Sequence, residues 1–251
     1  MGEPFSYVLE QLDLPAELAE LEGAACVAEE EATGQQVTVE GYALDGEAVV
    51  YGVVDSISYP HLPTFQRYQY PSRLPDDVLV RLEDVSRRVI TRIGLEAHTF
   101  NIEFFWDDTH GDLSLLEVNP RHSQSHAKLF ELVDGLPNHA CMIDLALGRE
   151  PHLPRREGPY DVAAKWYLKR FADGVVTRVP SAEEIAEVED SVADLRVSVL
   201  VDEGDRLSEQ VDNDSYSYKL ANVYLAANDE QELLTKYQRC VESLSFEFDE
   251  V

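Results

Sequence analysis

Two short runs of the sequence carry carboxylate and amide side chains close together, and an arginine follows the second run. The first run, "FNIEFFW", contains Glu103, and the second, "LLEVNPR", contains Glu117, Asn119 and Arg121. Side chains two positions apart in a strand point to the same side, so Glu117 and Asn119 share a face. Mg²⁺ accepts such oxygen donors when water and phosphate complete its octahedron. A guanidinium beside it can stabilise negative charge on a transferring phosphoryl or acyl group.

The two runs are joined by a polar turn that contains glycine, which predicts a β-hairpin. A turn centred on His110 places Glu103 directly across from Glu117. Like charges in that position destabilise a sheet by about 0.2–1 kcal/mol. Two interpretations therefore stay open: a metal site that uses both carboxylates, or an exposed hairpin whose charges face solvent.

The sequence around these runs predicts the elements that must position them. Alternation of apolar and polar residues over 24–58 predicts a strand, a turn and a two-strand meander. Four prolines in 60–75 predict a segment without regular structure. Apolar residues at helical spacing predict a helix over 76–93 that ends at Gly94.

The remaining elements give the fold class. Helices are expected over 15–22, 127–133, 137–147, 182–188 and 230–244, and strands over 163–171, 175–179, 196–201 and 218–226. A composition break at "GREPHLPRREGPY" marks a candidate subdomain boundary. The predicted class is α+β, built on an antiparallel sheet flanked by helices.

Composition excludes several function classes. The chain has 251 residues with 20 basic and 49 acidic side chains, a net charge of −29 that disfavours a nucleic-acid partner. The acids are spread along the whole chain, which is typical of a solvated surface in proteins of salt-loving organisms. No apolar run approaches the roughly 20 residues of a membrane span. The first residues lack signal-peptide features, so the expected location is the cytoplasm.

Other common site motifs are missing from the sequence. The three cysteines are far apart among apolar neighbours and are expected in the core. His122 and His126 are four apart, but no third ligand follows at a suitable spacing, so no zinc site is predicted. Neither a glycine-rich phosphate loop nor a nucleophile elbow is present.

Glu103 followed by "LLEVNPR" resembles the metal-binding end of the ATP-grasp superfamily, nearest to its biotin carboxylase-like and carboxylate-amine ligase branch. The upstream "CVAEEEATGQQVTVEG" resembles the hinge strand of that family and the strand after it. The resemblance covers the C-terminal half of the fold only. It implies that residues 1–23 are the tail of an incomplete N-terminal subdomain and that residues 24–153 are the C-terminal subdomain. Residues 154–251 would form a small α+β subdomain with β-rich character, similar to the C-terminal region of biotin carboxylase.

The resemblance also implies ligand roles for the residues at the strand ends. Glu103 and Glu117 would bridge Mg²⁺, or Mn²⁺ in its place, on bound ATP. Asn119 would complete the shell of the second ion, and Arg121 would steady the acyl phosphate or carboxyphosphate.

For the nucleotide itself, the implied residues lie further upstream and within the hairpin. Glu29 and Glu30 in the hinge would meet the adenine amino group. Phe105 would pack beneath the adenine ring. Gln36 falls where the family usually has a ribose-binding Glu or His, and an amide can still hold a ribose hydroxyl.

The implied activity is that of an ATP- and Mg-dependent ligase, which activates a carboxylate as an acyl phosphate and joins it to an amine or similar nucleophile. The alternative is a truncated, non-catalytic ATP-grasp remnant that binds metal or nucleotide at most. The ligase requires a lysine that grips the phosphates of ATP, whereas the remnant does not. Lys165 and Lys169 in the tail have no obvious geometry for binding these phosphates. Expected partners are a small-molecule carboxylate, an amine, a chain that supplies the N-terminal half, and a second copy in a homodimer.

One departure from the family pattern narrows the class of substrate. Biotin carboxylases carry an acidic residue just before a histidine after the arginine, whereas this sequence has Ser125 before His126. The expected base for bicarbonate is therefore missing. This argues against biotin carboxylation and for another acid–amine ligation, such as one of amino acids.

Overall fold

The computed structural model describes residues 28–210, 214 and 217–250. The chain divides into two compact units, residues 1–32 and 33–251. The expected helix over 15–22 and the expected subdomain tail over 1–23 lie outside the described residues. A strand was expected before Gly34. The described residues of that segment, 28–33, have no regular secondary structure.

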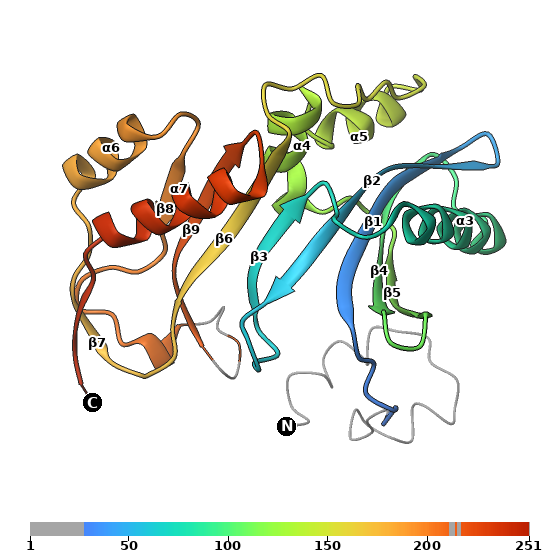
Figure 1. The fold of residues 1–251 in the computed structure, drawn as a ribbon. Helices are drawn as coiled ribbons and strands as arrows, with labels where there is room; N and C mark the ends of the chain where they lie inside the picture. Colours follow the sequence, from blue (N-terminus) through green and yellow to red (C-terminus); the bar gives the residue numbers. More distant parts are fainter. Residues whose placement is uncertain (1–27, 211–213, 215–216, 251) are drawn as a thin grey trace, which may run out of the picture. The chain divides into compact units, whose positions relative to one another are not determined.

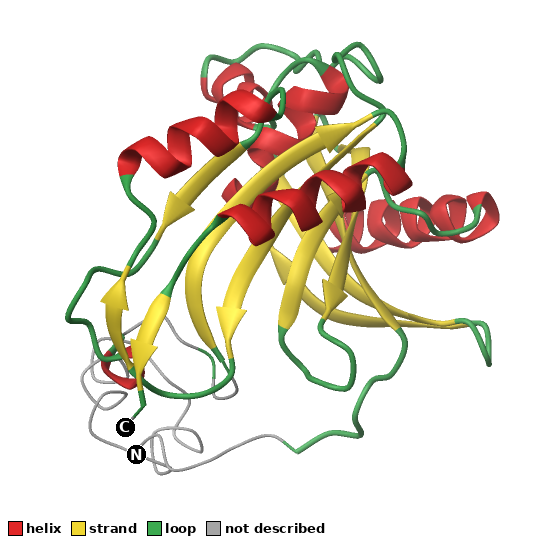
Figure 2. Ribbon diagram, turned by 60° about the vertical axis from the view of Figure 1, so that its left-hand side comes forward, coloured by secondary structure: helices red, strands yellow, loops and turns green. Residues whose placement is uncertain are grey.

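An eight-stranded antiparallel sheet runs through the second unit (Figures 1 and 2). Its spatial order is β5-β4-β1-β2-β3-β6-β9-β8. The strands are β1 (Gln35–Leu44), β2 (Glu47–Ser58), β3 (Phe65–Tyr70), β4 (His98–Asp107), β5 (Asp112–Asn119), β6 (Val162–Arg170), β8 (Arg196–Val199) and β9 (Tyr218–Ala227). A separate pair joins β7 (Val175–Arg178) to β10 (Glu247–Asp249), and β10 was not predicted. The predicted α+β class with an antiparallel sheet and flanking helices is confirmed.

The helices pack on the sheet as their sequence patterns require. They are α3 (Asp76–Ile93), α4 (Ala127–Asp134), α5 (His139–Ala146), α6 (Ala182–Ser191) and α7 (Glu230–Ser243), with short 3₁₀ turns η1 (Gln124–His126) and η2 (Leu207–Glu209). Helix α3 buries Val78 and Leu82 in one core with Phe100 and Ile102 of β4. It ends at Gly94, whose φ of 76° is left-handed and therefore suits glycine. Helix α4 packs on β3, β6 and β9, and α7 packs on β6 and β9.

The proline-rich segment is where the sequence prediction was wrong, because β3 lies within it. Pro63 and Pro71 flank the strand and do not interrupt it, so no ladder hydrogen bond within β3 is lost. The residues between the prolines, "FQRYQY", are rich in aromatic side chains that favour strands. Strand β3 pairs with β2 on one side and with β6 on the other.

This pairing carries the sheet across the predicted subdomain boundary. The expected boundary at residue 153 falls in the connection between α5 and β6, where the structure has no regular element. Strands from both sides of that connection belong to one sheet through the β3–β6 pairing. The division into 24–153 and 154–251 stays a prediction.

Candidate active site

One face of the neighbouring strands β1, β4 and β5 is polar. Alternation along each strand places the following side chains on it: Gln36, Thr38 and Glu40 of β1, Asn101, Glu103 and Phe105 of β4, and Glu117 and Asn119 of β5. The alternate residues, such as Val37 and Ile102, are fully buried against α3. The sequence pattern thus turns the apolar side toward α3 and presents the oxygen donors on the other side.

The predicted pairing of the two carboxylates is confirmed: Glu103 lies directly across from Glu117. The register shifts by one residue just beyond this pair. A turn centred on His110 would place Trp106 across from Ser114, but Trp106 pairs with Leu113. The irregularity leaves Leu116 without a cross-strand partner and 51% exposed. Leu116 is therefore not part of the apolar face of the hairpin.

The pair of glutamates concentrates negative charge at one point of the sheet. Burial raises the pKa of Glu103, and the negative charge of Glu117 raises it further. Within the described residues, the one side-chain hydrogen bond to Glu103 comes from Gln36, whose Nε2 donates to Oε2 at 2.8 Å, and neither glutamate has an ion pair with Lys or Arg. Two facing carboxylates that lack a protein cation are the donor set that Mg²⁺ accepts.

Asn119 and Arg121 stand beside this pair at the end of β5. Asn119 Nδ2 donates to Glu117 Oε1 at 2.6 Å and to Asn101 Oδ1 at 3.1 Å. Asn101 in turn donates from Nδ2 to the backbone oxygen of Arg121 at 3.0 Å. The exposed Arg121 side chain reaches back to Asn119 Oδ1, with Nη2 at 3.4 Å. Asn101 was not predicted as a site residue, although its place two positions before Glu103 was the available signal.

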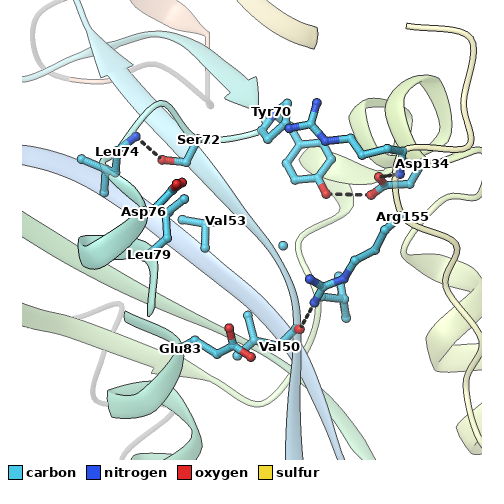
Figure 3. Close-up of a pocket in the computed structure, with 14 residues that line it drawn as sticks. Val50, Val53, Tyr70, Ser72, Leu74, Asp76, Leu79, Glu83, Asp134 and Arg155 are labelled. Atoms are coloured by element: carbon cyan, nitrogen blue, oxygen red, sulfur yellow. Dashed lines mark hydrogen bonds between the residues drawn. The ribbon is translucent and has the colours of Figure 1, made fainter. Parts of the chain in front are cut away.

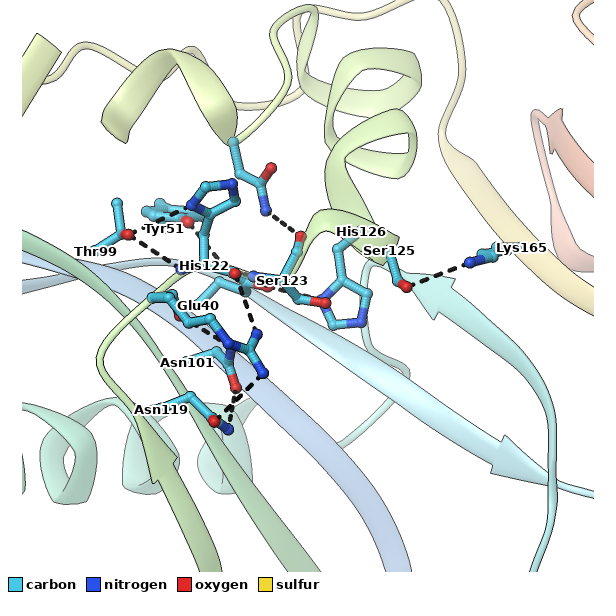
Figure 4. Close-up of polar contacts among 12 residues, drawn as sticks. Glu40, Tyr51, Thr99, Asn101, Asn119, His122, Ser123, Ser125, His126 and Lys165 are labelled. Atoms are coloured by element: carbon cyan, nitrogen blue, oxygen red, sulfur yellow. Dashed lines mark hydrogen bonds and ion pairs between the residues drawn. The ribbon is translucent and has the colours of Figure 1, made fainter. Parts of the chain in front are cut away.

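Buried Glu40 holds the segment that follows Arg121 (Figure 4). Its Oε1 accepts a hydrogen bond from the Ser123 backbone N–H at 3.1 Å and lies 2.8 Å from His126 Nδ1. Its Oε2 accepts from the Tyr51 hydroxyl at 3.0 Å. Sequence reasoning missed this anchor, and the only local signal was an acidic residue on the same strand face as Gln36.

A histidine pair lies on the other side of the same segment. His122 Nε2 is 2.7 Å from His139 Nδ1, and the backbone N–H of His122 donates to Thr99 Oγ1 at 3.0 Å. Burial lowers the pKa of His122. Within the described ranges, no group of three or more His, Cys, Asp or Glu side chains is placed to hold a metal ion.

Some of these residues line a cavity of about 690 Å³, but Glu117 and Asn119 are not among its lining residues. Its lining includes Asn101, Glu103, Arg121, Ser125 and His126. A cavity lined by carboxylate and amide oxygens, a guanidinium and an imidazole can bind a phosphorylated or acylated anion.

The nucleotide-binding residues inferred from the resemblance occupy a different place. Gln36 and Phe105, across from each other on β1 and β4, line a second cavity of about 240 Å³ together with Gly34. Glu29 and Glu30 are exposed residues of the first unit. The structure thus brings Glu103, Glu117, Asn119 and Arg121 together and places Gln36 and Phe105 in the lining of the smaller cavity.

A third cavity of about 390 Å³ contains none of the predicted site residues (Figure 3). Several of its polar side chains are already engaged within the protein. The Tyr70 hydroxyl donates to Asp134 Oδ2 at 2.7 Å, and Arg155 Nη2 donates to the backbone oxygen of Val50 at 2.8 Å. We therefore place the candidate active site at the carboxylate pair.

Comparison with known proteins gives the class of this fold. The family described as "Carbamoyl-phosphate synthase L chain, ATP binding domain" matches residues 70–153. The carbamoyl phosphate synthase large chain of Nostoc sp. (strain PCC 7120) is 33% identical over 107 residues, which are 43% of this chain and 9% of that protein. The residues matched by the family include Glu103, Glu117, Asn119 and Arg121.

Solved structures share the fold over most of the chain. Phosphoribosylglycinamide synthetase from Anaerococcus prevotii has a TM-score of 0.69 at 11% identity, over 88% of this chain and 55% of that one. L-Amino acid ligase from Bacillus licheniformis has a TM-score of 0.67 at 14% identity, over 86% and 52%. The biotin carboxylase domain of Hydrogenobacter thermophilus 2-oxoglutarate carboxylase, solved with MgADP, has a TM-score of 0.59 at 16% identity, over 85% and 46%.

All of these are ATP-grasp proteins, and the predicted resemblance to the ATP-grasp superfamily is confirmed. The chain has the fold of a portion of an ATP-grasp protein. It spans 9% of the curated relative and about half of each of these solved chains. Within the described ranges, no helix is long and apolar enough to cross a membrane.

Proposed function

We propose that the chain forms the metal- and acyl-phosphate-binding portion of an ATP- and Mg-dependent ligase. The ligase activates a carboxylate as an acyl phosphate and joins it to an amine or similar nucleophile. The observation that carries this proposal is the facing pair of Glu103 and Glu117 without a protein cation, with Asn119 and Arg121 at the end of the same hairpin.

In this proposal Glu103, Glu117 and Asn119 hold Mg²⁺, or Mn²⁺ in its place. The bound ion neutralises charge on the phosphates of ATP during in-line transfer. Asn119 already donates to Glu117 and thereby fixes the orientation of that carboxylate. Arg121, whose backbone is held by Asn101, supplies the positive charge that steadies the acyl phosphate.

The nucleotide base and ribose would lie toward the smaller cavity. Phe105 offers a ring beneath the adenine, and Gln36 offers an amide to a ribose hydroxyl. Gln36 Nε2 donates to Glu103 in the structure, so a ribose would compete with Glu103 for this donor. Glu29 and Glu30 in the hinge segment would meet the adenine amino group.

The replacement of an acidic residue by Ser125 favours an acid–amine ligation over biotin carboxylation. The solved neighbour from Bacillus licheniformis is a ligase of L-amino acids, which supports substrates of that kind. We further propose that a partner polypeptide supplies the region that grips the phosphates. A cytoplasmic location and a homodimer belong to the same proposal.

The test is isothermal titration of Mg·ATP into the purified chain at molar salt, with Glu117→Gln beside it. We expect wild type to bind and Glu117→Gln to lose at least about tenfold in affinity, because one of the two facing carboxylates no longer carries charge. Glu131→Gln is the matched control, since Glu131 is an exposed glutamate of α4 paired with Lys128. Equal affinities of wild type and Glu117→Gln, or no binding by either, would contradict the proposal.

A second measurement addresses the non-catalytic alternative. A chain that binds Mg·ATP through Glu117 is assayed for ADP release with a panel of amino acids and hydroxamate trapping of acyl phosphate. Acyl phosphate formation supports the ligase. Binding without any acyl phosphate, also in the presence of a supplied N-terminal half, would favour a remnant that only binds metal and nucleotide.

A further inference from the structure

Lys165 on β6 is a buried lysine without an acidic partner among the described residues. It is 7% exposed, and its one side-chain hydrogen bond is donated from Nζ to Ser125 Oγ at 3.3 Å. Its neighbour on the same strand face, Lys169, has an ion pair with Asp214 at 2.7 Å. In a chain with 49 acidic and 20 basic residues, a buried ammonium that no carboxylate of the described residues neutralises calls for a physical explanation.

The surroundings of Lys165 compensate its charge only in part. Its Nζ lies 4.8 Å from the ring centre of Tyr167 and 5.6 Å from that of Tyr224. Burial lowers the pKa of Lys165 to about 8, and the positive charge of Lys219 acts in the same direction. A buried cation without a counter-ion costs stability, and an anionic ligand would relieve that cost.

Lys165 adjoins the main cavity through Ser125. Ser125 and Tyr68 line that cavity together with Glu103 and Arg121. Lys165 lies directly across from Tyr68 in the β3–β6 pairing. Figure 4 shows Lys165 reaching Ser125 from β6, on the side of the segment away from Asn119. A second cationic group, separate from the Arg121 guanidinium, therefore lies next to the cavity, in contact with its lining residue Ser125.

We propose that Lys165 and Ser125 bind the carboxylate of the amine substrate, so that this substrate is an amino acid or another amine that carries a carboxylate. The inference rests on the proposed function, in which Arg121 and the carboxylate pair serve the acyl phosphate. The cation at Lys165 is then available to the other substrate. The hydroxyl of Ser125 allows this, because an acidic side chain at that position would neutralise Lys165 itself.

The test is a pH titration at a constant molar concentration of KCl. The lysine side chains are followed by NMR through the ¹³C signals of their Cε atoms. The chain has five lysines, and Lys165→Met identifies the signal of Lys165. We expect L-alanine to raise the pKa of Lys165 from about 8 to about 9 or higher, because a carboxylate stabilises the ammonium. L-Alaninamide, which lacks the carboxylate, is expected to leave it unchanged. The signal of partly exposed Lys128, paired with Glu131, is the internal control.

Ser125→Asp keeps the test valid if Lys165→Met fails to fold. The new carboxylate is expected to raise the pKa of Lys165 without ligand and to abolish the response to L-alanine. No response of wild type to L-alanine, or an equal response to L-alaninamide, would overturn the inference.

The Mg·ATP titration separates the two proposals. A chain that binds Mg·ATP through Glu117 but shows no L-alanine response contradicts this inference alone. A chain whose Lys165 responds to L-alanine while Mg·ATP does not bind contradicts the proposed function alone.

Discussion

Glu40 and Glu103 lie on the same face of adjacent strands, yet their surroundings differ. Glu40 is fully buried, and its two oxygens are engaged by Tyr51, Ser123 and His126. Glu103 is half-buried, receives one side-chain hydrogen bond from Gln36, and faces another carboxylate. Among the described residues, both carboxylate oxygens of Glu40 therefore have hydrogen-bond partners, whereas only Oε2 of Glu103 has one.

This difference separates a structural carboxylate from one that can take an external cation. A buried carboxylate with a full set of donors fixes the elements that carry those donors. A carboxylate that faces a like charge weakens the fold unless a cation arrives. The contrast can be tested by changing each glutamate and measuring stability with and without Mg²⁺.

The largest expected effect comes from Glu40→Ala. We expect the free energy of unfolding to fall by about 3–5 kcal/mol, because the change leaves buried Tyr51 and His126 without their partner. Urea denaturation at molar salt measures it. Glu131→Ala, at an exposed site of α4, is the control and should change the value by less than about 0.5 kcal/mol. A loss below about 1 kcal/mol for Glu40→Ala would remove the distinction between the two glutamates.

A second expected effect is stabilisation by ligand. Mg·ATP at about a hundred times its dissociation constant should raise the free energy of unfolding of wild type by about 2.7 kcal/mol. Glu117→Gln at the same ligand concentration should gain much less, because the metal loses a charged donor. Thermal unfolding with and without Mg·ATP measures both, and an equal gain in the two chains would argue against a metal role for Glu117.

Glu103→Gln should change the free energy of unfolding by a smaller amount. In metal-free buffer it should raise this free energy, whereas Glu40→Ala lowers it. The folded-state pKa of Glu103 is raised, so its stabilising effect is present at low pH and is lost as pH rises through that pKa. At about pH 7 the variant should therefore be more stable than wild type by about 0.2–1 kcal/mol. Near pH ~4 the difference should shrink. A variant less stable than wild type at neutral pH would show that the ionised carboxylate is needed by the fold itself.

The smallest expected effect concerns His122. Its folded-state pKa is lowered, so it stabilises the fold above the ordinary histidine pKa, and that contribution is lost as pH falls. Wild type should therefore lose more stability than His122→Asn between about pH 7 and about pH 5. Denaturation curves at the two pH values measure the difference. Parallel losses in both chains would mean that protonation of His122 has no role in acid sensitivity.

Much of the local structure was predictable from sequence, and the failures have physical causes. Helix α3 and the β4–β5 hairpin follow from apolar periodicity, which acts over a few residues. Strand β3 was missed because its flanking prolines were interpreted as breaking it, whereas its place between β2 and β6 depends on partners far along the chain. The register change after Glu103 was also missed, since no residue pattern in the hairpin required it.

By itself, the sequence determined that Glu103 and Glu117 face each other, with Asn119 and Arg121 at the end of one strand. Those relations depend on a period of two and a short turn, which are local properties of the chain. Only the tertiary structure decided that Glu40 meets His126, 86 residues away, and that Lys165 meets Ser125, 40 residues away. Such contacts exist only when the sheet has formed, because distant segments are brought together by strand pairing and burial rather than by their own sequence.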